Sequence, residues 1–390
     1  MEEHRSTPHF SGHKAGTAPG AREQFSTRIA FLIAGLAVSA WAPLIPYARQ
    51  RLHVDDAQLG LLLLCLGIGS VAGMPLAGGL AARFGCRRVL LCMGAMFCIA
   101  LPFLAIAPTM LGMALALLIF GAGIGIFDVV MNIQAVIVER SAHRAMMSGF
   151  HGMYSVGGIA GAGGASALMA LGSSPLVAAV VVALLAAVAL AAIAKALLPY
   201  AAESGAPAFV LPRGSVLLIG AICFALFLAE GAVLDWSAVF LTAVRNVDPA
   251  TAGFGYVAFA ATMTLGRLTG DCVVHRLGAT RVVLFGALLA ASGFLLAILA
   301  PSWVLSIIGF GLVGAGASNV VPVMFSAAGR QQVMPTHLAV AAITTMGYAG
   351  VLLGPALLGF VAKATTLSFA LGLLAALLVA VAMTARAVTR

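Results

Sequence analysis

Three acidic side chains lie inside long apolar stretches of this sequence, and their type and position make them the first candidates for chemistry. They are Asp128, Glu230 and Asp235. An ionisable side chain at the centre of a bilayer costs roughly 2.5–3.5 kcal/mol on insertion scales, so each should face water or a bundle interior rather than lipid. A sheltered carboxylate can bind a proton reversibly or accept hydrogen bonds from a polar ligand. We therefore expect these residues to handle protons or a polar solute.

Polar partners accompany the first acid at helical spacing. Asn132 lies four residues after Asp128, and residues four apart share a helix face, so both should point into one cavity. His151 and Tyr154 share a face of the next helical segment by the same rule. We predict that Asp128 is the principal proton-linked group, with the other three near it. A carboxylate satisfied by helix–helix hydrogen bonds and a packed, neutral histidine are the alternatives.

The second half of the sequence supplies residues that should face this group. Glu230 and Asp235 are five apart, roughly 140° round a helix of 3.6 residues per turn, so they need not share a role unless the helix is broken. Trp236 adjoins Asp235, and Trp41 ends the first apolar stretch; either indole could stack on a sugar ring or anchor at the membrane interface. Asn319 follows several glycines and precedes a proline, and this irregular backbone predicts that it lines a cavity.

The composition shows what kind of element must position these side chains. Of 390 residues, 62% are hydrophobic and 8% charged, against about 45–50% and about 25% in soluble proteins. This excludes a water-soluble enzyme of ordinary composition. The six Cys have no metal-ligand spacing, and no Gly-rich loop ends in Lys-Ser or Lys-Thr, so we expect no metal, no cofactor and no nucleotide-driven pump. The net charge of +9 includes no basic run longer than two residues, so we expect no nucleic-acid partner.

Apolar runs broken by charges, Pro and Gly predict an all-α membrane protein with twelve transmembrane helices in two six-helix bundles. The glycine run from Gly157 to Gly164 should permit close helix packing. The predicted helices are 28–48, 56–77, 88–107, 109–137, 146–170, 175–198, 214–243, 250–271, 281–300, 302–326, 336–361 and 364–386.

The distribution of basic residues predicts the topology. With a cytoplasmic N-terminus, 17 of the 21 Lys and Arg, Arg267 among them, fall in cytoplasmic loops or termini. The exceptions are Arg49, Arg51, Arg245 and Lys363. By the positive-inside rule, we expect both termini to be cytoplasmic.

Domain limits follow from the polar stretches. We expect a flexible cytoplasmic tail at 1–24, bundles at 25–198 and 214–390, and a cytoplasmic linker at 199–213. The segment 82–91 (ARFGCRRVLL) matches 275–284 (HRLGATRVVL) at an offset of 193 residues. Repeated halves with a midplane site are typical of secondary transporters.

The first of these repeated segments resembles the signature loop of the major facilitator superfamily, and the resemblance extends over all twelve segments. In GGLAARFGCRR, Ala82 stands where the family has Asp; the second copy has Asp271 at the family's Gly position and His275 at its Asp position. The resemblance implies a cytoplasmic gate whose charge contacts differ between inward-open and outward-open states. The gate residues that it implies are Arg83, Gly85, Arg87, Arg88, Asp271, Arg276 and Arg281.

Within the superfamily the chain is most similar to the sugar-permease side, especially the fucose and proton symporter branch and its relatives of unassigned substrate. The likeness rests on FDVVMNIQ (127–134), SGFHGMYSVGGIAG (148–161), EGAVLDWSAVFL (230–241) and GAGASNVVPVMFS (314–326). It implies a monomeric secondary transporter in the lipid bilayer of the inner membrane. Such a protein moves a small, sugar-like solute by alternating access, with protons as the coupling ion.

Other functions stay open at this point. A proton-driven drug or metabolite exporter would carry a Gly-Pro pair on the fifth helix, whereas Gly161 is followed by Ala162. A transporter-like sensor would bind a solute without flux. A membrane-embedded enzyme would need its acids clustered near one interface, and here they are spread over several helices.

Overall fold

The computed structural model describes residues 19–54, 56–201, 211–247 and 254–389, and these ranges contain helices and no strand. The first 18 residues of the expected tail and most of the expected linker lie outside them. The helices are α1 (Ala21–Ala40), η1 (Ala42–Leu44), α2 (Ile45–Leu52), α3 (Asp56–Ile106), α4 (Met110–Ala142), α5 (Met147–Ala170), α6 (Pro175–Ile193), η2 (Ala194–Ala196), α7 (Ser215–Ala243), α9 (Phe254–Leu277), α10 (Ala279–Leu299), α11 (Trp303–Ala317), α12 (Val320–Arg330), α13 (Thr336–Ala364) and α14 (Leu367–Thr389).

These helices make twelve crossings, as the sequence predicts. Ten spans in the described chain are long and apolar enough to cross a membrane, with α11 and α12 forming one of them. One of the ten lies in α3, which is 51 residues long and doubles back at Gly85, where φ is 79° and ψ 158°. This span therefore crosses twice, which brings the count to eleven. Few residues other than glycine adopt this backbone conformation. The twelfth crossing is α5, whose 24 residues extend about 36 Å, more than the bilayer core of about 30 Å.

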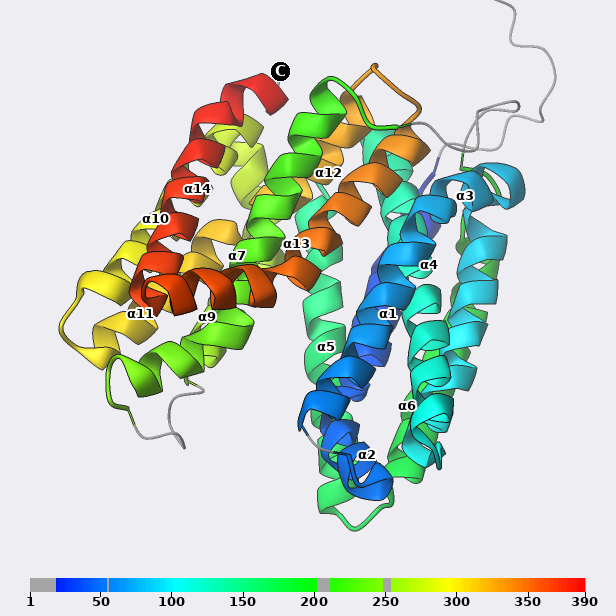
Figure 1. Cartoon of the computed structure of the whole chain (residues 1–390). Helices are drawn as coiled ribbons and strands as arrows, with labels where there is room; N and C mark the ends of the chain where they lie inside the picture. The colour runs from blue at the N-terminus through cyan, green and yellow to red at the C-terminus, as the bar shows by residue number, and fades with distance from the viewer. Residues whose placement is uncertain (1–18, 55, 202–210, 248–253, 390) are drawn as a thin grey trace, which may run out of the picture.

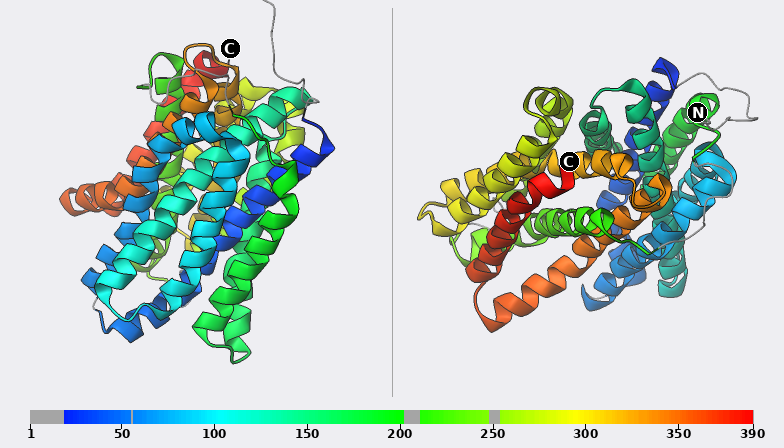
Figure 2. Two further views of the ribbon diagram at one scale, coloured as in Figure 1. Left: turned by 90° about the vertical axis from the view of Figure 1, so that its right-hand side faces the viewer. Right: turned by 90° about the horizontal axis from the view of Figure 1, so that it is seen from above.

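The crossings form two bundles that lie side by side (Figure 1, Figure 2). Helices α1 to α6 make one bundle and α7 to α14 the other, and the expected limits of 25–198 and 214–390 remain predictions. The bundles meet where α5 packs against α9 and α13 against α3. Both described chain ends, η2 and the turn between α12 and α13 lie on one side, at the top of Figure 1, which we call the terminal face.

Helix α1 begins at Ala21, four residues before the expected start of the first bundle at 25. The Glu23 carboxylate accepts a hydrogen bond of 2.7 Å from the Gly20 N–H, which satisfies one of the free donors of the first turn. Ser26 and Thr27, in the next turn, are fully buried. The apolar pattern of the sequence does not predict this start of α1, because polar side chains stabilise the N-terminal part of the helix.

Glycines in α5 bring it into direct contact with α1. A Cβ atom on Gly157 would collide with the Leu32 carbonyl, and one on Gly161 with the Leu36 carbonyl. The glycine run therefore permits close packing, as expected, although Gly164 has open space around it. This packing fixes the α5 face that carries His151.

Two of the basic residues that were expected on the outer side of the membrane act as caps at the ends of helices. Arg51 donates to the carbonyls of Leu104, Ala105 and Ala107 at 2.9, 2.5 and 3.0 Å, at the end of α3.

Arg245 does the same at the end of α10. It donates to the carbonyls of Ala297 and Ile298 at 3.0 and 2.8 Å and to the Ser306 hydroxyl at 3.1 Å. A cation here satisfies free carbonyls and complements the helix dipole. Arg51 and Arg245 are 194 residues apart, so the internal repeat extends to these caps.

Candidate functional site

Asp128 lies on α4 in the interface between the two bundles. It is 7% exposed, and its carboxylate lies beside the Tyr348 hydroxyl of α13. The Tyr348 hydroxyl also lies beside that of Tyr154 of α5. Asn132 does not bond to this carboxylate, because its Nδ2 donates to the backbone carbonyl of Asp128 at 2.9 Å. Three side chains from both bundles thus form one network, which we call the Asp128 network (Asp128, Tyr154 and Tyr348).

A second polar cluster joins α7, α9 and α5. Arg267 and Glu230 form an ion pair at 3.4 Å, with side chains 11% and 19% exposed. Arg267 also donates to the Ser155 hydroxyl at 3.4 Å, across the interface between the bundles.

The expected placement of Arg267 in a cytoplasmic loop is wrong. Helix α9 continues to Leu277, ten residues beyond Arg267, which at 1.5 Å per residue is about half the bilayer core. The insertion cost that identifies Asp128 and Glu230 as candidate site residues applies equally to an arginine within a membrane helix. The same criterion therefore identifies Arg267 from the sequence. Tyr348 gives no comparable signal, because its partner depends on how α13 crosses α4.

His151 and Asn319 lie on opposite sides of the same interface. His151 packs between the rings of Phe31 and Phe325, with centroid distances of 5.2 and 5.4 Å. Asn319 lies at the break between α11 and α12, where the irregular backbone was expected. Its Nδ2 donates to the Gly266 carbonyl at 3.0 Å, and so holds α9 against the break.

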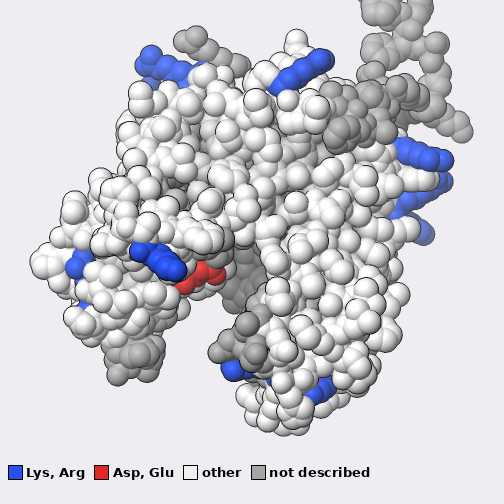
Figure 3. Space-filling model, in the orientation of Figure 1, with Lys and Arg blue, Asp and Glu red and all other residues white. Residues whose placement is uncertain are grey.

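The tryptophans and Asp235 are dispersed. Trp41 is 5% exposed at the end of α1. The Trp236 ring lies against Gly359 of α13. Helix α7 is continuous, so Asp235 does not share the surroundings of Glu230 and is exposed. Figure 3 shows acidic atoms at the edge of a hollow between the bundles, on the side away from the terminal face.

Several of these side chains carry buried polar atoms that have no hydrogen-bond partner within the described part of the chain. An unpaired buried group costs free energy, so each is a position where a ligand or water could bond. The atoms are Trp41 Nε1, Asn132 Oδ1, His151 Nε2, Trp236 Nε1, Arg267 Nε and Asn319 Oδ1.

The expected gate residues have different roles. Gly85 makes the turn in α3, and Arg87 bonds the carbonyls of Leu197 at 2.8 Å and Lys195 at 2.7 Å, which ties α3 to the end of α6 within one bundle. Asp271 crosses between the bundles, because its carboxylate accepts from the Gly149 N–H at 3.0 Å in the first turn of α5. The remaining four are exposed: Arg83, Arg88, Arg276 and Arg281.

Contacts between the bundles close the terminal face. Gly78, 193 residues before Asp271, lies against the first turn of α13, where a Cβ would be 3.0 Å from the His337 carbonyl oxygen. Arg140 of α4 reaches the Thr336 hydroxyl at 3.5 Å. The two repeats therefore use equivalent positions, each within the last turns of a helix, to hold the two bundles together. The molecule is closed here and hollowed on the opposite side (Figure 3).

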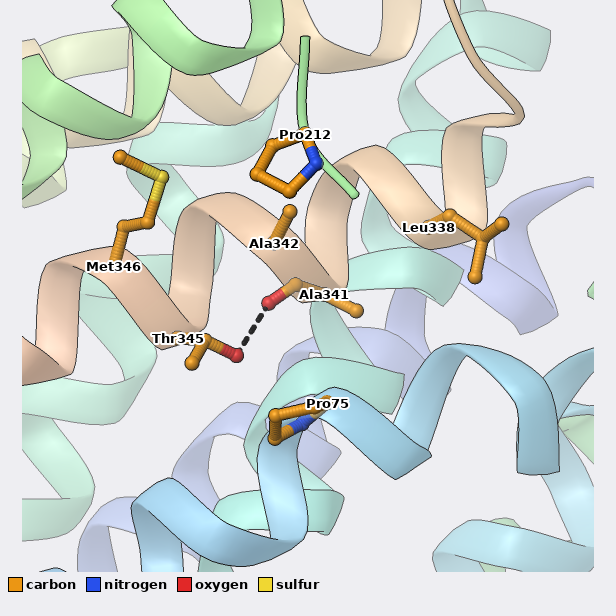
Figure 4. Close-up of a pocket in the computed structure, with 7 residues that line it drawn as sticks. All are labelled: Pro75, Pro212, Leu338, Ala341, Ala342, Thr345 and Met346. Atoms are coloured by element: carbon orange, nitrogen blue, oxygen red, sulfur yellow. Dashed lines mark hydrogen bonds between the residues drawn. The ribbon is translucent and has the colours of Figure 1, made fainter. Parts of the chain in front are cut away.

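A separate cavity of about 180 Å³ lies where α3, α13 and the segment before α7 meet. Its one hydroxyl, on Thr345, is bonded to the Ala341 carbonyl of its own helix at 2.8 Å (Figure 4). The cavity contains none of the expected site residues, and its apolar lining does not suit a polar solute. Its lining residues are Pro75, Pro212, Leu338, Ala341, Ala342, Thr345 and Met346.

Known proteins are similar to this chain in sequence and in architecture. The family model of the Major Facilitator Superfamily matches residues 28–244, more than half of the chain. An uncharacterized MFS-type transporter of Yersinia pestis is 56% identical over 379 residues, covering 97% of this chain and 99% of its own. An uncharacterized transporter of Sinorhizobium fredii is 35% identical over 360 residues, covering 90% and 95%.

Two solved transporters share the fold at low identity. The E. coli fucose:proton symporter superposes with a TM-score of 0.77 at 17% identity, covering 94% of this chain and 98% of that one. A proton:xylose symporter superposes with a TM-score of 0.72 at 12% identity, covering 95% of each chain. With the sequence matches, these findings establish that the chain is a transporter, not an enzyme, and belongs to the major facilitator superfamily.

Proposed function

We propose that this transporter moves a small polar, sugar-like solute across the inner membrane by alternating access, coupled to protons. The observation that carries the proposal is the Asp128 network, in which a carboxylate of one bundle lies beside a hydroxyl of the other. Support comes from the fold shared with proteins whose names include fucose, xylose and protons.

A proton on Asp128 changes how strongly the bundles are held together. Hydrogen bonds to an ionised carboxylate are roughly twice as strong as those between neutral groups. Loading the proton therefore weakens the attraction between Asp128 and the Tyr348 hydroxyl, and a solute hydroxyl can compete for the same partners. Any ligand that interacts differently with two arrangements shifts the balance between them.

The terminal face acts as one of two gates in this proposal, and we place it in the cytoplasm. Opening it requires the Asp271 carboxylate to leave the first turn of α5 and Gly78 to leave the first turn of α13. The placement is supported by Arg51 and Arg245, because these two of the four exceptions to the positive-inside pattern act as helix caps.

Uptake into proteoliposomes tests the proposal. The purified full chain is reconstituted, and the accumulation of labelled neutral sugars and sugar acids is followed with and without an imposed pH difference. We expect at least one solute to accumulate above its external concentration only when the pH difference is present. A solute that binds without entering would contradict transport and favour a sensor. Export of amphipathic drugs under the same gradient would instead support an exporter.

A further inference from the structure

Arg267 has more hydrogen-bonding capacity than its neighbours use. A guanidinium carries five N–H donors. Its contacts with Glu230 Oε1, Glu230 Oε2 and Ser155 Oγ are each 3.4 Å, whereas charge-assisted bonds of this kind are normally about 2.7–2.9 Å. The Arg267 Nε is buried and has no partner in the ranges that the structure describes. The ion pair is therefore loose and leaves donors available to another acceptor.

The position of Arg267 makes a solute a suitable acceptor. The Asn319 amide nitrogen donates to the Gly266 carbonyl. The Asn319 Oδ1 is buried and accepts no hydrogen bond from the described residues. Ser155 brings a hydroxyl from the opposite bundle. A guanidinium that reaches a hydroxyl of the opposite bundle, with an amide bonded to the neighbouring residue of its own helix, matches a ligand that carries one anionic group and several hydroxyls.

We propose that Arg267 binds the carboxylate of the transported solute, which is a sugar acid rather than a neutral sugar. The inference rests on the proposed transport of a sugar-like solute and narrows its class. The planar guanidinium can donate two parallel bonds to a carboxylate, which a neutral hydroxyl cannot accept in the same way. Glu230 is paired with the Arg267 guanidinium in the absence of solute, and the solute carboxylate takes the place of the Glu230 carboxylate.

Matched ligands separate charge from sugar shape. Binding of D-glucuronate and D-galacturonate to the purified full chain is measured by calorimetry and thermal shift, beside D-glucose and the methyl ester of D-glucuronate. The ester keeps the ring and hydroxyls and lacks the charge. We expect a hexuronate to bind at least about tenfold more tightly than its neutral counterparts, since hydrogen bonds to charged groups are among the stronger ones. Equal binding of acid and ester, or no binding of either hexuronate, would overturn the proposal.

Variants distinguish a ligand from a purely structural ion pair. Arg267→Gln should lose the preference for the acid, and Glu230→Gln should keep or increase it because the competing carboxylate is gone. The double variant, Arg267→Gln with Glu230→Gln, leaves no unpaired charge and should fold even where Arg267→Gln does not. Arg330→Gln, at an exposed arginine of α12, is the control. An unchanged acid preference in the double variant would overturn the proposal.

The outcomes also separate this inference from transport itself. Proton-driven accumulation of a neutral sugar without hexuronate binding would leave transport standing and remove the role of Arg267. Hexuronate binding that depends on Arg267, without uptake of any solute, would support the role of Arg267 and contradict transport.

Discussion

At the scale of single residues, the acids of α4 and α7 have different partners. Asp128 lies beside a tyrosine, whereas Glu230 is paired with an arginine. A paired carboxylate gives up its counter-ion to take a proton, while Asp128 gives up only its interaction with a neutral hydroxyl. This difference favours Asp128 as the proton-linked group and leaves Glu230 to position Arg267.

The Tyr348 hydroxyl can be tested by itself. Tyr348→Phe removes one oxygen and keeps the ring, which packs on Phe227 at 5.6 Å, so the fold should be retained. A hydroxyl that hydrogen-bonds the Asp128 carboxylate during transport would be lost, which should weaken proton-driven accumulation by roughly tenfold or more. Tyr47→Phe, at a 42% exposed tyrosine, is the control for uptake assays. Wild-type accumulation by Tyr348→Phe would remove Tyr348 from the proposed mechanism.

Single residues also show how far sequence reasoning reaches. Asp128 could be found because a charge in an apolar run is costly wherever its partner lies. Its predicted proximity to Tyr154 agrees with the structure, but Asn132 bonds backbone instead of the carboxylate. Tyr348 could not be found, because the contact depends on a crossing between helices more than 200 residues apart in the chain.

At the scale of elements, glycine positions determine where helices turn and how closely they pack. The turn at Gly85 and the break before Asn319 follow from visible Gly and Pro signals. The start of α1 does not, because a polar cap holds it. The predicted helix 250–271 ends six residues before the observed end of α9 at Leu277. The polar residues Asp271, His275 and Arg276 give this last stretch the hydropathy of a loop.

Gly85 is the element-scale residue most sensitive to substitution. Its φ of 79° and a Cβ collision with the Pro199 carbonyl should make Gly85→Ala strongly destabilising. The backbone conformation alone costs roughly 1–3 kcal/mol. The melting temperature of the purified protein measures the effect. Gly163→Ala, in α5 with open space around it, should leave that temperature unchanged or raise it slightly; equal effects of both variants would contradict this account.

The cap at Arg245 gives a second prediction. Arg245→Ala leaves the carbonyls of Ala297 and Ile298 without their side-chain donor, and we expect a loss of about 1–3 kcal/mol in stability. Thermal unfolding compares it with Arg386→Ala, which removes an exposed arginine of α14. Melting temperatures that fall equally in both variants would show that Arg245 is not a cap.

At the scale of the whole molecule, the two repeats close the terminal face with different residues at equivalent positions. Gly78 permits a backbone approach to α13, and Asp271 supplies a carboxylate to the first turn of α5. A negative charge at a helix N-terminus contributes about 0.3–1 kcal/mol, and up to about 2 kcal/mol in partly buried geometries. The closed arrangement therefore includes one carboxylate contact that a single substitution can remove.

Asp271→Asn should shift the molecule toward opening at the terminal face. The lost charge contact corresponds to a change of about two- to thirtyfold in the population ratio. Labelling of a cysteine introduced at buried Ser148 by a maleimide reagent should be faster in the variant. Arg386→Gln provides the background rate. Unchanged labelling would mean that Asp271 does not hold this face closed.

Proton-driven accumulation by Asp128→Asn tests the central proposal most directly. The amide mimics a protonated carboxylate, so the variant cannot cycle its charge. We predict that reconstituted Asp128→Asn binds solute and exchanges it between equal pools on the two sides of the membrane. It should fail to accumulate solute under an imposed pH difference, while Glu23→Gln, at the start of α1, accumulates like the wild type. Uphill accumulation by Asp128→Asn would contradict the assignment of Asp128 as the coupling group.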